Sequence, residues 1–381
     1  MAPRVEVPVN PEALQWAVRR ARVGAQALAR AAGVTPARAM AWLEGQARPT
    51  YKQARQIAER LHVSLGQLLL PPPDRVTLPV ADFRRGRREM DEPSPELLDT
   101  LYDALRKQDW WREVHRGRRL AFVGSFNWRQ ARPADVAEAI RQVIPVQWEQ
   151  RQARDWHDFL NRLSAATERA GILVLRRGIV GYNTHRPLDT GDFAGFALAD
   201  PAAPLIFVNT QDYVARRNFT FAHELAHIWL GHSGVDDNLE LETPLDLETF
   251  CDRTAAELLV PEDAFRQIWT NTRGDPYEVA QYCTRFFWVS LWMVARRALD
   301  LGLIPLATYR DLVERYADVY PIRRTDRGGG DFYRNVEIYN SPTFTQAVID
   351  ATMQGELGYD EAASLLGLRL TTFIDYLESR I

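Results

Sequence analysis

The sequence His223-Glu224-Leu225-Ala226-His227 lies within the apolar, uninterrupted stretch FTFAHELAHIWLGH, which indicates a helix. Residues four apart project from one helix face, so both imidazoles can reach the same ion. Glu224 is rotated toward a water held by that ion rather than toward the ion. Zinc lowers the pKa of such a water to about 7, and the adjacent carboxylate can accept its proton and pass it to a leaving amine. The pattern therefore predicts a buried helix that carries hydrolytic metal chemistry.

A third ligand is needed, because the five residues alone also fit a buried helix with two hydrogen-bonded histidines. Glu248, in LETFCDRTAAELLVP, is a carboxylate on a second predicted helix. Asp252 lies one helical turn further on, where it can accept the other ring N–H of a metal histidine. His232 competes with Glu248, but it stands nine positions after His223, one short of the metzincin spacing. We therefore interpret His232 as a helix cap or rim residue.

Length and composition bound the class of protein. A chain of 381 residues predicts two or three domains. With 46% hydrophobic and 25% charged residues, it has the composition of an ordinary soluble protein. The sequence contains no apolar run of membrane-spanning length and no signal-peptide pattern, so we expect a cytoplasmic protein without membrane contact. The two cysteines, Cys251 and Cys283, lack CxxC spacing and are expected to be reduced and structural.

Prolines and glycines divide the chain into four predicted segments. Residues 1–75 are predicted to form short helices that stop at the triple proline Pro71–Pro73. Residues 76–150 are expected to be a linker and a helical spacer. Residues 151–325 combine a small sheet of about three strands with the helices that hold the chemistry. A glycine run at 328–330 introduces a small helical C-terminal module, 326–381.

Charge is unevenly distributed along the chain. Residues 1–70 carry ten Arg or Lys and four acidic residues, whereas the whole chain has a formal net charge of −3. Such asymmetry fits a module that binds a polyanion, because phosphate contacts supply most non-specific DNA affinity. On charge alone, solvated helix faces rich in arginine explain it equally well.

The stretch ALARAAGVTPARAMAWLEGQARPT resembles the Xre/Cro repressor-type helix-turn-helix. In that arrangement Thr35 is the N-cap of the recognition helix. The best candidates for base or phosphate contact are Arg38 and Gln46, and for phosphate contact Lys52 and Arg55. The recognition positions offer few side chains that read bases, so a helix-turn-helix retained for protein docking is the alternative.

The segments RRNFTFAHELAHIWLGH and ExxCDRTAAELLVP resemble the ImmA/IrrE-type metallopeptidases. The resemblance covers roughly residues 160–270 and implies zinc bound by His223, His227 and Glu248, with Glu224 as general base. That family usually has asparagine where this chain has Asp252, which should still orient a histidine. Together with the helix-turn-helix and the DFR at 82–84, the chain is similar to Xre–ImmA/IrrE fusions. The implied fold class is mainly α with a small β-sheet, an α+β zincin-like peptidase domain, plus an all-α N-terminal helix-turn-helix domain.

A weak internal repeat links the two ends of the chain. EAASLLGLRLTTFIDYLES at 361–379 aligns with ALARAAGVTPARAMAWLEG at 27–45 at a constant offset, with Gly367 matching Gly33. We expect a second, small helix-turn-helix-like unit. Because few basic residues surround it, a packing or partner role is favoured over DNA binding.

Two functions fit these patterns. The first is a zinc-dependent regulatory endopeptidase that cleaves an Xre-type repressor, with DNA bound through residues 1–75. The second is a DNA-binding transcriptional regulator or antitoxin-like protein whose metal site is structural or sensory. The retained Glu224 favours catalysis, because a purely structural site needs no general base. Two imidazoles and one carboxylate favour Zn²⁺ over Mn²⁺ without excluding the latter, and homodimer formation is left open.

Overall fold

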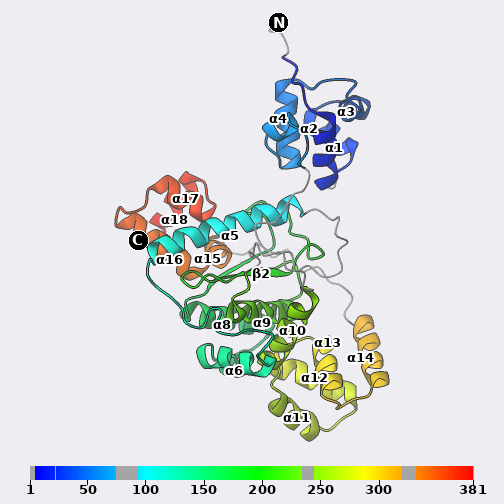
Figure 1. The fold of residues 1–381 in the computed structure, drawn as a ribbon, viewed down its shortest axis with the longest axis vertical. Helices are drawn as coiled ribbons and strands as arrows, with labels where there is room; N and C mark the ends of the chain where they lie inside the picture. The colour runs from blue at the N-terminus through cyan, green and yellow to red at the C-terminus, as the bar shows by residue number, and fades with distance from the viewer. Residues whose placement is uncertain (1–4, 22, 74–92, 234–243, 320–331, 381) are drawn as a thin grey trace. The chain divides into compact units, whose positions relative to one another are not determined.

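The computed structural model describes residues 5–21, 23–73, 93–233, 244–319 and 332–380 (Figure 1). The described residues form two compact units, one up to residue 73 together with 93–99, and one over 100–380. Many helices and one small sheet confirm the expected fold class. The connector from residue 74 to 92, with its DFR at 82–84, and the glycine run at 328–330 lie outside the described residues. Among the described helices, none is both long and apolar enough to cross a membrane.

The N-terminal unit is built from short helices: α1 Pro11–Arg20, α2 Ala25–Ala32, α3 Pro36–Leu43, α4 Tyr51–Leu61 and the 3-10 helix η1 Gly66–Leu68. Polar side chains begin three of them, because they satisfy backbone N–H groups of the first turn. Asn10 caps α1, Thr35 caps α3, and Thr50 forms a capping box with Gln53 at the start of α4. The buried apolar residues between Leu14 and Leu68 make one cluster, so this unit has a hydrophobic core of its own.

The predicted helix pair of the N-terminal unit is present. Helix α2 ends at Gly33, which has a left-handed backbone with φ of 65°. A side chain at such a φ is strained, so glycine suits this turn. The hydroxyl of Thr35 then accepts a hydrogen bond from the backbone N–H of Arg38 at 3.3 Å and starts α3.

The second unit contains the three-stranded sheet that the sequence predicted. Its strands are β1 Leu173–Arg177, β2 Gly195–Leu198 and β3 Leu205–Asn209, in the order β1-β3-β2. β1 runs parallel to β3 and β2 runs antiparallel to it. Helices α8 Trp156–Arg169 and α9 Val214–Leu230 pack on the sheet, and α15 Phe332–Asn340 packs on β1. In Figure 1 the sheet lies between α15 and the pair α8 and α9.

The segment expected to be a linker and spacer contains α5 Pro95–Val114, α6 Pro133–Val143 and most of α7 Val146–Gln152. From residue 100 on, it lies in the second unit. Val136, Ala137 and Ile140 on α6 are fully buried in the same core as α9 and α10 Pro244–Leu259. These positions share one helix face, and burying that apolar face against α9 and α10 removes it from water. α6 and α7 thus share a core with the helices of the candidate site, and the linker and helical spacer over 76–150 stays a prediction.

Further helices complete the second unit after α10: α11 Glu262–Asn271, α12 Pro276–Phe287, α13 Leu291–Asp300 and α14 Leu306–Val319. Apolar residues of α11 to α14 extend the same core. α10 itself packs against α9, α6 and α7, which fixes the residues that it presents to α9.

A loop packs against the end of α9 at two glycines. The backbone N–H of Gly124 donates to the carbonyl of Ile228 at 3.1 Å, and Gly231 ends α9 with a left-handed φ of 70°. A Cβ on Gly231 would lie 2.8 Å from Cα of Gly124. The two backbones can approach this closely only without side chains, and Gly124 gives the carbonyl of Ile228 a second donor beside the N–H of Gly231.

The C-terminal helices reproduce the N-terminal pair at the offset found in the sequence. They are α16 Pro342–Met353, α17 Tyr359–Leu366 and α18 Leu370–Glu378. Gly367 has a left-handed φ of 70° between α17 and α18, as Gly33 has between α2 and α3. Tyr376 is buried on α18 where Trp42 is buried on α3. The repeat is therefore a matched pair of helices joined by the same turn.

Candidate metal centre

Helix α9 presents the HExxH residues from a buried helix. It is apolar around most of its circumference because the sheet lies on one side and α10 on the other. Glu224 and His227 are buried, and His223 is half-buried. The two histidines are one turn apart, and their Nε2 atoms are 3.0 Å from each other. The helical spacing thus brings two nitrogen donors to one point, as expected from the sequence.

Helix α10 adds the carboxylate of Glu248 to this point. Its Oε2 lies 3.1 Å from Nε2 of His223, and its Oε1 lies 3.2 Å from Nε2 of His227. The side chain is almost fully buried. Three donors from two helices therefore converge, and they are the three that the sequence predicted as ligands.

The outer nitrogen of His223 faces a second carboxylate. Its Nδ1 lies 2.9 Å from Oδ1 of Asp252, on the next turn of α10 after Glu248. When the ring carries its proton on Nδ1, this N–H donates a hydrogen bond to the Asp252 carboxylate. The lone pair of Nε2 then points to the place where the other candidate ligands converge. Asp252 therefore lies behind His223, one of the two histidines predicted as ligands.

The donors fit a zinc ion. Oε1 of Glu248 is buried and accepts no hydrogen bond from the described residues, although an imidazole nitrogen lies beside it. A buried carboxylate oxygen without a donor is costly unless a cation compensates it. Two imidazole nitrogens and one carboxylate form a common catalytic zinc ligand set. The side chains present can hold the ion.

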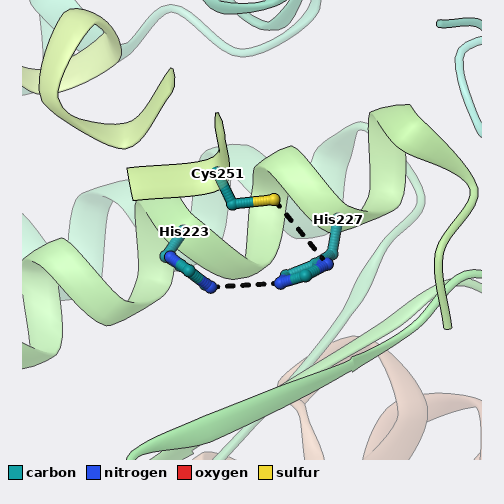
Figure 2. Close-up of side chains that lie close together, drawn as sticks. All are labelled: His223, His227 and Cys251. Atoms are coloured by element: carbon teal, nitrogen blue, oxygen red, sulfur yellow. Dashed lines mark hydrogen bonds between the residues drawn. The ribbon is translucent and has the colours of Figure 1, made fainter. Parts of the chain in front are cut away.

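Cys251 also lies at the centre, and Figure 2 shows it with the two histidines. By residue type and proximity, His223, His227 and Cys251 could hold a metal ion. The Sγ of Cys251, however, lies 3.8 Å from Nδ1 of His227, whereas Nε2 of that ring points toward His223. The thiol therefore contacts the back of the ring, and Glu248 completes the donor set better.

The two glutamates of the site differ in their preferred charge. Burial raises the pKa of Glu224 to about 8; His223 opposes this shift and Glu248 adds to it. Burial also acts to raise the pKa of Glu248, but the two facing imidazoles outweigh it and lower the pKa to about 2. Glu248 therefore stays ionised, as a ligand must, while Glu224 holds a proton more readily.

The histidine pKa values differ as well. Burial acts to lower the pKa of His223, but its contacts with Asp252 and Glu248 raise it to about 10. Burial lowers the pKa of His227, and the carboxylate of Glu248 only partly offsets this. The two rings thus lie in unequal electrostatic surroundings, since only His223 has a carboxylate on both sides.

Strand β2 borders the site on its open edge. A Cβ on Gly195 would lie 2.7 Å from the carbonyl oxygen of Phe207 and 3.0 Å from Oε1 of Glu224. No larger residue fits there without displacement, so the backbone of β2 passes directly beside the Glu224 carboxylate. Among the described strands, β2 pairs only with β3, so it is an edge strand of the described sheet.

The residues proposed for DNA contact all lie on the N-terminal unit. Arg38, Gln46 and Lys52 are exposed. Arg55 is exposed and pairs with Glu59 at 3.4 Å. Thr35 uses its hydroxyl to cap α3. The structure thus leaves the cationic side chains in solvent, where they can meet phosphate.

Two further expectations concern side chains near the site. His232 lies just after α9, and its backbone N–H donates to the carbonyl of His227 at 3.1 Å. Cys251 and Cys283 are both buried thiols that form no disulfide bond.

Sequence reasoning missed two contributors to the site. Cys251 was treated only as a structural thiol, although its position three residues after Glu248 puts it on the same face of α10. Gly195 carried no signal in the sequence, because its closeness to Glu224 depends on how the sheet packs on α9.

Comparisons with known families agree with this geometry. Residues 167–299 match the family model described as IrrE N-terminal-like domain, Peptidase_M78. Residues 340–379, which span α16 to α18, match a domain of unknown function, DUF8813. No curated protein matches the chain. The first match covers the whole sheet, both helices of the candidate metal centre and the helices up to α13, and it supports a metallopeptidase of the ImmA/IrrE type.

Proposed function

We propose that this chain is a zinc-dependent regulatory endopeptidase that cleaves a repressor-type protein and thereby switches gene expression. The observation that carries the proposal is the convergence of His223, His227 and Glu248, with Glu224 buried next to them. The match to the IrrE N-terminal-like domain over 167–299 supports the metallopeptidase class.

The roles of the side chains follow from their positions. His223 and His227 would hold the ion through Nε2, and Glu248 through its carboxylate. Zinc in such a site supplies Lewis acidity, which polarises the scissile carbonyl and eases the ionisation of water. Glu224 would accept the proton of the attacking water on its carboxylate and return it to the departing amide nitrogen.

An extended peptide has a place to bind beside these groups. The outer edge of β2 can pair with a substrate strand through backbone hydrogen bonds. Gly195, without a side chain, would let that strand lie close to Glu224. Binding through the backbone suits an endopeptidase, because it requires a locally unfolded segment and little sequence preference.

The N-terminal unit would supply the regulatory context. Its exposed Arg38, Gln46, Lys52 and Arg55 suit contact with DNA, and its basic charge suits phosphate. We propose that it brings the peptidase to DNA on which a repressor of similar fold is bound.

The decisive experiment compares Glu224→Gln with the wild type. Glutamine cannot accept the water proton, so the variant should keep its zinc and its fold but lose nearly all cleavage. Glu262→Gln, at a half-buried acid on α11 that pairs with Arg266, is the matched control and should cleave like the wild type. Zinc-loaded proteins are incubated with a peptide library from a digested cell extract and with candidate helix-turn-helix repressors, and products are identified by mass spectrometry.

A DNA-binding regulator with a structural or sensory metal is the second candidate. The exposed cationic side chains of the N-terminal unit favour it, because they need no peptidase activity to act. In that case wild type and Glu224→Gln would leave every peptide and repressor intact, while DNA binding would respond to zinc.

A further inference from the structure

One turn of α10 lies along both metal histidines. Glu248, Cys251 and Asp252 are spaced i, i+3 and i+4, so all three project from one face of the helix. Glu248 meets both Nε2 atoms, and Asp252 meets Nδ1 of His223. Cys251, fully buried between them, meets Nδ1 of His227 at 3.8 Å (Figure 2). Each histidine therefore has one side chain of α10 at its Nε2 and another at its Nδ1.

The hydrogen-bond roles at His227 follow from its ring. Its Nε2 points at Glu248 and His223 and must present a lone pair to bind an ion. A neutral imidazole then carries its proton on Nδ1. That N–H faces Sγ of Cys251, and 3.8 Å is within the range of a long hydrogen bond to sulfur. The sulfur is thus the acceptor of this contact.

We propose that Cys251 is a positioning residue that fixes the tautomer and orientation of His227 for metal binding, by accepting the Nδ1–H hydrogen bond on its sulfur. This inference rests on the proposed zinc centre. It makes the centre asymmetric, because a carboxylate orients His223 and a weaker, uncharged acceptor orients His227.

Two other roles for Cys251 predict different behaviour. A direct ligand would have its sulfur turned to the Nε2 atoms. The sulfur lies within 4.8 Å of a ring nitrogen of each histidine, but the ring atom that it contacts is Nδ1 of His227, at 3.8 Å. A residue that only fills space could be replaced by any apolar side chain of similar size, such as valine. Of these roles, only the hydrogen-bonding one predicts that Cys251→Ser binds zinc more tightly than Cys251→Ala or Cys251→Val.

The test measures metal affinity of the full chain. Zinc is titrated against a competing chelator for wild type, Cys251→Ser, Cys251→Ala and Cys251→Val, with Cys283→Ala as control. Cys283 is a buried thiol on α12 outside the centre. Circular dichroism melting identifies any variant that fails to fold. We expect Cys251→Ala and Cys251→Val to bind zinc about 10–100-fold more weakly, Cys251→Ser to fall between them and wild type, and Cys283→Ala to match wild type.

Cobalt substitution separates positioning from ligation. Co²⁺ bound to wild type should show d–d bands without a sulfur-to-cobalt charge-transfer band, and in Cys251→Ala the d–d bands should change shape. A charge-transfer band that Cys251→Ala abolishes would overturn the proposal in favour of a thiolate ligand. Equal zinc affinity of wild type and Cys251→Val would overturn it in favour of packing. If wild type and His223→Ala bind zinc equally weakly, the metal centre itself fails, and with it the proposed function.

Discussion

Lys107 and Asp103 should respond to substitution in opposite directions. Both lie on α5, where Asp103 contacts Lys107 and, across to β1, Arg177. The side chain of Lys107 is fully buried, and that of Arg177 is 2% exposed. One carboxylate thus balances two buried cations. We expect Lys107→Met to stabilise the second unit at neutral pH and Asp103→Ala to destabilise it.

The magnitudes follow from the burial of these charges. Burial lowers the pKa of Lys107 from 10.5 to about 8, and the attraction of Asp103 only partly opposes this. That difference corresponds to a cost of about 3 kcal/mol for keeping the ammonium in the native protein at pH 7. Methionine avoids the cost and fills a similar volume, so we expect a gain of about 1–3 kcal/mol. Removing Asp103 leaves two uncompensated cations and should cost about 3–5 kcal/mol.

The pH dependence gives this prediction a second test. Because the native pKa of Lys107 is lower than the unfolded one, the unfolded chain binds more protons between pH 8 and pH 10.5. Wild-type stability should therefore rise with pH across this window relative to Lys107→Met, and the advantage of the variant should shrink. Urea denaturation of the full chain, followed by circular dichroism at pH 7 and pH 10, measures both effects. A loss of more than about 1 kcal/mol for Lys107→Met at pH 7, or a gap between the two proteins that does not change with pH, would refute the reasoning.

Three further predictions concern the metal centre and the N-terminal unit. Asp252→Ala should weaken zinc binding about 10–100-fold, while Asp252→Asn, which keeps an acceptor for His223, should have an affinity closer to that of the wild type. Equal zinc affinities of the two variants in a chelator competition would contradict this role of Asp252. Gly195→Val should reduce peptide cleavage because its side chain would displace β2 beside the reacting groups, and unchanged cleavage rates would contradict the place assigned to the substrate. Residues 5–73 should fold alone and bind DNA with an affinity that falls steeply as salt rises, with Arg38→Ala weaker; absence of any gel retardation at low salt would leave protein docking as the role of this unit.

Much of this protein could be predicted from local patterns. The HExxH spacing indicated a buried helix with two histidines on one face, and α9 has that form. The residues Thr35 and Gly33 marked the turn between α2 and α3, and both occupy the expected conformations. Such features depend on residues within a few positions of each other, so helical geometry alone determines them.

The role of α6 could not be predicted in this way. Its apolar face showed that it packs against something, but not that the partners are α9 and α10, more than seventy residues later in the chain. An amphipathic helix has the same local pattern whether it lies in a spacer or in a core. Only the folded chain decides which apolar faces meet.

The sequence by itself determined which chemistry was available: two imidazoles four residues apart, a glutamate between them, and an acidic helix downstream. The tertiary structure decided how these groups face one another. Packing of α10 against α9 put Glu248 at the Nε2 atoms, Asp252 behind His223 and Cys251 behind His227. Packing of the sheet on α9 put the backbone of Gly195 beside Glu224. The physical reason is that spacing along a helix fixes which residues share a face, whereas the rotation and separation of two packed elements depend on every side chain in the interface between them.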